Sequence, residues 1–122
     1  MAKGDDIEER LLNLSVAVVK LCSKLPKTLT GTHIASQLLR SGTAPPPNYA
    51  EARGAESRKD FIHKLGITLK ELNESHIWLE MVGRVGIVPE AQVKALAKEC
   101  TELARIIYKS IQTASGTLKI NR

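Results

Sequence analysis

The stretch SRKDFIHKLGITLKELNESHIWLEMVGRV, from Ser57 to Val85, predicts the longest helix of the chain and decides the fold. Side chains suited to a core recur in it at steps of three and four residues, the spacing of one helix face. Ser57 is placed to cap the helix start, with Asp60 at the third position. The predicted core stripe consists of Ile62, Leu65, Leu69, Leu72, His76 and Leu79, with Phe61, Thr68, Ser75 and Val82 alongside.

A second stripe runs along another face of the same predicted helix. It consists of Ile67, Glu71, Glu74, Trp78, Met81 and Val85. A monomer has no need of Trp78 and Met81 away from its core, so this face is either partly buried within the fold or buried by another subunit. We favour an oligomer interface. We expect it to be formed by Ile67, Glu71, Glu74, Trp78 and Met81, together with Tyr49.

Three further helices are predicted around this one. The first carries an apolar stripe at Ile7, Leu11, Leu14, Val18, Leu21 and Leu25. The predicted helices span residues 5–25, 31–54, 57–85 and 89–114, and residues 115–122 form a frayed tail. Short connections between amphipathic helices favour an all-α, antiparallel up-down-up-down four-helix bundle. We expect residues 1–122 to form a single domain of this kind.

Three consecutive prolines interrupt the second predicted helix, at Pro45–Pro47. A proline inside a helix removes a backbone hydrogen bond and disfavours helical geometry at the preceding residue. The second helix is therefore expected to be kinked or split near 44–47, with extended backbone there, and to resume at Asn48. The carbonyl groups freed by the prolines need donors, for which water, Asn48 and Arg40 are candidates.

The composition favours a cytoplasmic protein with an aliphatic core. Aromatic residues make up only 3% of the chain. Cys22 and Cys100 lack CxxC spacing and fall in apolar stripes, so we expect buried, reduced thiols. There is no signal-peptide pattern, and no apolar run reaches the roughly 18 residues of a membrane span.

Residues that could carry catalysis are sparse. A di-iron bundle needs two Glu-x-x-His pairs, whereas this chain has only Asp60-x-x-His63, so neither a metal nor a cofactor is expected. Glu71, Glu74 and His76 lie close together in the sequence and provide a remote enzymatic alternative. Ordinary ion pairs for the two carboxylates are the simpler interpretation, and we expect no enzyme.

The distribution of charge says more than the net charge of +5. No acidic residue occurs between Glu9 and Glu51, so basic residues there could meet phosphate or could simply be solvated. One candidate nucleic-acid-binding patch consists of Lys20, Lys24, Lys27, Arg84, Lys94 and Lys98. A second, more diluted by acidic residues, consists of Arg53, Arg58, Lys59, Lys64, Arg105 and Lys109.

The block from Gln37 to Leu79 resembles the 23S rRNA-intervening-sequence protein family. The matching segments are Gln37-Leu38-Leu39-Arg40, Ser41-Gly42-Thr43, Asn48-Tyr49-Ala50-Glu51, the basic stretch Arg53 to Asp60, Lys70-Glu71, and Glu74 with Trp78-Leu79. The resemblance implies an up-down four-helix bundle that assembles as a homopentamer, with genes often lying within bacterial 23S rRNA genes. A related branch, the accessory variability determinant of diversity-generating retroelements, binds nucleic acid and a reverse transcriptase through a basic surface.

The basic stretches and the resemblance together predict a non-enzymatic nucleic-acid-binding module, with RNA as the ligand, that acts as a cyclic homo-oligomer. The alternative is a protein-interaction scaffold that recruits a partner enzyme such as a reverse transcriptase.

Overall fold

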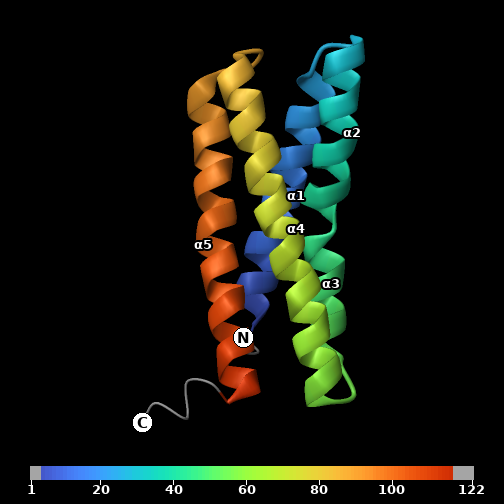
Figure 1. Cartoon of the computed structure of the whole chain (residues 1–122), viewed down its shortest axis with the longest axis vertical. Helices are drawn as coiled ribbons and strands as arrows, with labels where there is room; N and C mark the ends of the chain where they lie inside the picture. The colour runs from blue at the N-terminus through green and yellow to red at the C-terminus, as the bar shows by residue number, and fades with distance from the viewer. Residues whose placement is uncertain (1–3, 117–122) are drawn as a thin grey trace.

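A computed structural model describes residues 4–116, which form an antiparallel up-down-up-down helical bundle (Figure 1). Its helical segments are α1 (Asp5–Lys24), α2 (Leu29–Thr43), α3 (Pro45–Arg53), α4 (Arg58–Val85) and α5 (Glu90–Ser115). Segments α2 and α3 follow one another with a bend and together form the second helix of the bundle. The predicted all-α four-helix fold is confirmed. Of the predicted frayed tail, residues 117–122 lie outside the described part of the chain.

Side-chain caps set two of the helix starts. The Ser57 hydroxyl oxygen accepts a hydrogen bond of 3.0 Å from the Asp60 backbone N–H, as the sequence predicts. Thr28 caps α2 in the same way, accepting a bond of 3.1 Å from the Gly31 N–H. A threonine hydroxyl at this position satisfies an N–H group that has no partner within the helix. Helix α2 therefore begins at Leu29 rather than at residue 31.

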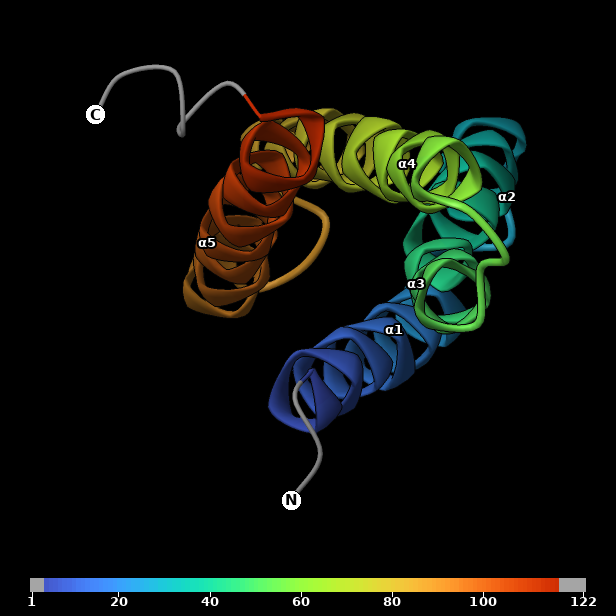
Figure 2. The same ribbon diagram turned by 90° about the horizontal axis from the view of Figure 1, so that it is seen from below.

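The core is aliphatic, and in the ring of helices around it α4 packs between α5 on one side and the bent α2–α3 helix on the other (Figure 2). The buried side chains of α4 are Leu65, Thr68, Leu72, Ser75, Leu79 and Val82. This face is rotated from the predicted stripe, because Ile62, Leu69 and His76 are only half-buried. A helix packed on two sides buries the face midway between its neighbours, which leaves His76 at the edge of the core.

The second helix bends where the prolines begin, so its predicted kink is present, but the backbone there is not extended. Ala44 has helical angles, with φ −75° and ψ −35°, and α3 starts at Pro45 rather than at Asn48. The three prolines thus occupy the first turn of α3. The N–H groups of a first turn have no partner within their own helix, so prolines remove nothing from α3 there. The loss falls instead on the carbonyl groups at the end of α2.

One of those carbonyl groups finds a donor on a different helix. The Ser15 hydroxyl of α1 donates a buried hydrogen bond of 2.5 Å to the Gly42 carbonyl. The side-chain amide of Asn48, a donor suggested by the sequence, instead donates to the carbonyl of Ala44, the residue before α3, at 2.9 Å. Ser15 was missed because a single buried serine carries no periodic signal. The bond joins α1 to the bent end of α2.

Gly42 also allows α1 and α2 to cross closely at the same point. A Cβ atom added at Gly42 would lie 2.6 Å from Cγ1 of Val18, far inside normal contact. Val18 is fully buried, so its side chain has no open space into which it could move. The crossing therefore requires glycine at position 42.

We expect Gly42→Ala to lower the free energy of unfolding by about 1–3 kcal/mol, because the added methyl group overpacks the crossing. The cost should shrink in a Val18→Ala background, where the methyl group has room, with a coupling energy of about 1 kcal/mol. Urea denaturation of the four proteins measures both quantities.

Gly66→Ala is the matched control, since Gly66 lies inside α4 and an added Cβ there meets nothing within 4 Å. It should raise the stability by about 0.5–1 kcal/mol, the usual gain from alanine in a helix. Equal effects of Gly42→Ala and Gly66→Ala would contradict the close crossing.

Both cysteines are buried free thiols. Burial raises the pKa of Cys22 to about 11, and its Sγ lies 3.6 Å from the Ala35 carbonyl oxygen. Burial, with a smaller contribution from the neighbouring Glu99 carboxylate, raises the pKa of Cys100 to about 12. Within the fold, both thiols therefore stay protonated at pH values that ionise an exposed cysteine.

These shifts predict a loss of stability in alkaline solution. Above pH 9, the ordinary pKa of a thiol, the unfolded chain loses protons that the folded chain keeps, so the free energy of unfolding falls as pH rises. The expected slope is up to about 1.4 kcal/mol per pH unit for the fully buried Cys100. Urea denaturation between pH 8 and pH 11 should show a shallower decline for Cys100→Ala, although this variant starts from a lower stability. If the free energy of unfolding of Cys100→Ala falls with pH as steeply as that of the wild type, the alkaline loss of stability does not come from the Cys100 thiol.

Candidate functional site

The first predicted basic patch gathers at one end of the bundle. The turn between α1 and α2 and the turn between α4 and α5 both lie at this end, which is the upper end in Figure 1. Two of its cations already form ion pairs: Arg84 lies 3.8 Å from Glu80, and Lys94 lies 3.0 Å from Glu90. The remaining members, Lys20, Lys24, Lys27 and Lys98, are exposed and form no ion pair within residues 4–116.

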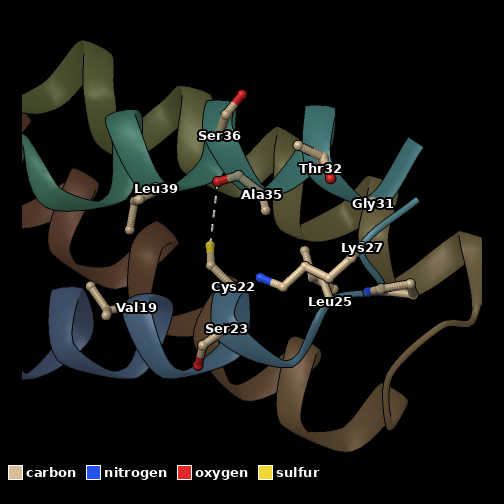
Figure 3. Close-up of a pocket in the computed structure, with 11 residues that line it drawn as sticks. Val19, Cys22, Ser23, Leu25, Lys27, Gly31, Thr32, Ala35, Ser36 and Leu39 are labelled. Carbon is tan, nitrogen blue, oxygen red and sulfur yellow. Dashed lines mark hydrogen bonds between the residues drawn. The ribbon is translucent and has the colours of Figure 1, made fainter. Parts of the chain in front are cut away.

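Three of these unpaired lysines come from the end of α1 and the turn that follows it. They are Lys20, Lys24 and Lys27, and we call them the lysine cluster. Beside the cluster, α1 and α2 enclose a shallow, largely apolar hollow of about 380 Å³ (Figure 3). The Cys22 thiol points across the hollow at the Ala35 carbonyl, and the Lys27 side chain reaches over it. The sequence did not predict this hollow.

Ion pairs occupy part of the second predicted patch, at the opposite end of the bundle. Arg53 donates to Asp5 at 2.8 Å and to Glu8 at 3.0 Å, and these bonds raise its pKa. Lys64 lies 2.8 Å from Glu51, which raises the lysine pKa. The other members, Arg58, Lys59, Arg105 and Lys109, are exposed. This end therefore keeps four cations outside any ion pair within residues 4–116, the same number as the first patch.

An apolar groove separates the first half of α2 from the last half of α4, at the same end as the lysine cluster. It consists of two adjoining hollows of about 470 and 420 Å³ that share Thr30, Ile34 and Met81. Figure 1 shows α2 and α4 diverging toward this end. Its other lining residues include Leu29, His33, Trp78, Val85 and Ile87, and we call the whole the α2–α4 groove.

Trp78 is held in place at the lower end of the α2–α4 groove. Its indole N–H donates to the Glu74 carboxylate at 3.1 Å, and the His33 ring lies edge-on to it, 6.0 Å between ring centres. Arg40 of α2 bonds both Glu71 and Glu74 across the gap to α4. The Glu71 side chain is only 14% exposed.

Most of the predicted interface residues do share one face of α4. Ile67, Glu71, Glu74 and Trp78 are half-buried along it, and Met81 is 41% exposed. Tyr49 is an exception: it is 9% exposed in the protomer core, where burial raises its pKa. A tyrosine on the inner face of α3 is therefore unavailable to a partner.

The residues of the enzymatic alternative do not converge. Glu71 and Glu74 face Arg40, whereas His76 turns to another side of α4, with its Nε2 atom 3.8 Å from Glu80. Residues two apart on a helix point in very different directions, which explains the separation. This arrangement leaves the alternative without a geometric basis.

An exposed apolar face of α1 was missed by the sequence analysis. Leu12, Val16 and Val19 are 49%, 45% and 44% exposed, and they recur at steps of four and three residues. We call them the α1 ridge. These three residues form a second apolar stripe at helical spacing. The sequence analysis considered only the longer stripe of core residues on the same helix.

Within residues 4–116, no group of three or more His, Cys, Asp or Glu side chains could hold a metal ion. Among the same residues, no helix combines the length and the apolar character that crossing a membrane requires.

The fold and its surfaces define a small all-α bundle protein with a basic end and an apolar groove. Residues 6–109 match the family described as 23S rRNA-intervening sequence protein, and the chain belongs to this family. A similar solved structure is that of a protein with unknown function from the S23 ribosomal protein family of Bacteroides thetaiotaomicron. It is 34% identical, with a TM-score of 0.81, over 87% of this chain and 98% of that one. No curated protein matches the chain.

Both findings confirm the resemblance that the block from Gln37 to Leu79 carries. The family description names no reaction, and the structural relative is of unknown function. The fold is therefore assigned by the comparisons, whereas the activity has to be argued from the surfaces.

Proposed function

We propose that the protein is a non-enzymatic RNA-binding module that acts in the cytoplasm as a cyclic homo-oligomer. The observation that carries this proposal is the lysine cluster. Its three ammonium groups are exposed at one end of the bundle, and no ion pair within residues 4–116 involves them. Clustered, uncommitted lysines attract phosphate and release its counterions, which provides affinity without a shaped pocket.

Assembly strengthens the case for phosphate binding. The family resemblance favours a pentamer, in which five chains of charge +5 would carry about +25. A cyclic arrangement repeats the lysine cluster around the ring, so several weak contacts can act on one RNA molecule. The half-buried α4 face and the α2–α4 groove supply apolar surface for subunit contact.

A protein-interaction scaffold that recruits a partner enzyme, such as a reverse transcriptase, is the second candidate. The α2–α4 groove favours it, because an apolar groove between helices accepts an amphipathic helix. The two candidates differ in how they respond to salt. Phosphate binding weakens steeply as salt rises, whereas apolar docking does not.

Replacing Lys20, Lys24 and Lys27 together by glutamine should weaken binding of a structured RNA and flatten its dependence on salt. Each lost phosphate contact should lower the slope of log K against log salt by about 0.7–0.9. Fluorescence anisotropy with a labelled RNA hairpin, between low and moderate salt, measures affinity and slope together.

Lys94→Gln is the matched control, because Lys94 lies at the same end but is already paired with Glu90. It should leave the slope close to that of the wild type. Arg58→Gln with Lys59→Gln tests the opposite end in the same assay. A wild-type slope in the triple variant, or an affinity that does not change with salt, would rule out the lysine cluster as the binding surface.

A further inference from the structure

We propose that the hollow between α1 and α2 is a binding site for a free aliphatic carboxylate, the anion of a medium-chain fatty acid. The alkyl chain lies in the hollow, and the carboxylate meets the ammonium group of Lys27. The family description assigns no ligand to this hollow. The site goes beyond the proposed function and does not depend on it, because its test contains no RNA.

The hollow is held open by its two ends. At one end, α1 and α2 cross closely at Gly42, where there is no room for a side chain. At the other end, a Cβ atom added at Gly31 would collide with the Pro26 carbonyl oxygen, so the turn between the helices is equally close. Between these ends the side chains of Cys22 and Ala35 are small, and the two helices enclose about 380 Å³ (Figure 3). The fold therefore fixes the shape of the hollow before a ligand binds.

The lining of the hollow offers apolar contact and few hydrogen bonds. Two of its hydroxyl groups are already engaged within their own helices. The Ser23 hydroxyl donates to the Lys20 carbonyl at 2.7 Å, and the Ser36 hydroxyl donates to the His33 carbonyl at 3.0 Å. A peptide or a sugar would lose hydrogen bonds to water here without regaining them, whereas an alkyl chain has none to lose.

The length of the hollow suits a medium-length alkyl chain. Its lining runs from Gly31 to Leu39 along α2 and from Val19 to Leu25 along α1. At a rise of about 1.5 Å per residue, these stretches are about 12 Å and about 9 Å long. An extended chain of about eight to ten carbons, with C–C bonds of about 1.5 Å, spans the same distance. Val19, the last residue of the α1 ridge, and Leu39 are 44% and 41% exposed, so the chain end covers apolar surface that otherwise meets water.

Lys27 supplies the charge that an anionic head group needs. It lines the hollow beside the turn, and its side chain reaches over the opening (Figure 3). No ion pair within residues 4–116 involves it. No acidic residue occurs between Glu9 and Glu51, a range that contains every lining residue. A carboxylate therefore meets an uncommitted ammonium group and no opposing charge from either helix of the hollow.

A series of free fatty acids tests the site directly. Hexanoate, octanoate, decanoate and dodecanoate are titrated into the isotope-labelled chain, each below the concentration at which it forms micelles, and backbone amide signals are followed by NMR. The signals of the lining residues should shift. Affinity should rise about two- to fourfold for each methylene added up to decanoate, and it should level off at dodecanoate because the hollow is then filled.

The head group is tested with decanol and decylamine, which have the same chain without the negative charge. Decanol should bind about two- to fivefold more weakly than decanoate, and decylamine more weakly still. Lys27→Gln should remove the preference for decanoate over decanol. Lys98→Gln is the matched control, because Lys98 is also exposed and unpaired at this end but does not line the hollow, and it should keep the wild-type preference.

The position of the chain is tested by filling the hollow. Ala35→Leu should lower the affinity for decanoate about tenfold or more, since the added side chain takes the place of the alkyl chain. Val19→Glu is a second variant at a half-exposed position, where a carboxylate repels decanoate without disturbing the core. Circular dichroism and thermal unfolding establish that each variant is folded.

The proposal is overturned if decanoate, decanol and decylamine bind equally well, or if the folded Ala35→Leu and Val19→Glu variants keep the wild-type affinity. Shifts confined to the α2–α4 groove, at residues such as His33 and Trp78, would place the alkyl chain there instead. Sedimentation with anionic phospholipid vesicles, combined with no shift on adding decanoate, would replace the free fatty acid by a membrane surface.

Discussion

The close crossing of α1 and α2 at Gly42 is the constraint on which the rest of the bundle depends. It has two components at one position: a backbone that tolerates no side chain beneath Val18, and a carbonyl group that Pro46 deprives of its helical donor. The Ser15 hydroxyl supplies the missing bond from the opposing helix. A buried carbonyl without a donor would be costly, so the bend and the crossing stabilise each other.

The bend then determines where the bundle is closed and where it is open. Beyond Ala44, α3 packs closely on α4, whereas α2 is held against α1 and leans away from the last turns of α4 (Figure 1). The α2–α4 groove lies where these two helices separate. A straight second helix would have to follow α4 or α1 along its whole length. The proline run thus acts on the surface indirectly, through the path of α2.

Features that depend on periodicity could be predicted from the sequence, and features that depend on contacts between helices could not. Helix count, topology, the Ser57 cap and the apolar face containing Trp78 all follow from local spacing. Ser15 depends on a carbonyl group 27 residues away, and no local pattern reveals such a partner. Tyr49 and His76 were misplaced because the direction of a helix face depends on its neighbours, which the sequence of one helix does not specify.

Contacts between helices also explain why the candidate phosphate surface is made of lysine and not of arginine. Arg10, Arg40 and Arg53 each bridge two carboxylates on another helix and thereby join α1 to α5, α2 to α4 and α3 to α1. A guanidinium fork suits such two-point contacts, whereas a lysine ammonium acts as a mobile point charge. With these arginines engaged at seams between helices, the lysine cluster remains available to a ligand. Lysine contacts to phosphate position a nucleic acid by its backbone and read little of its sequence, so under the proposed function any preference would have to come from the shape of the ligand.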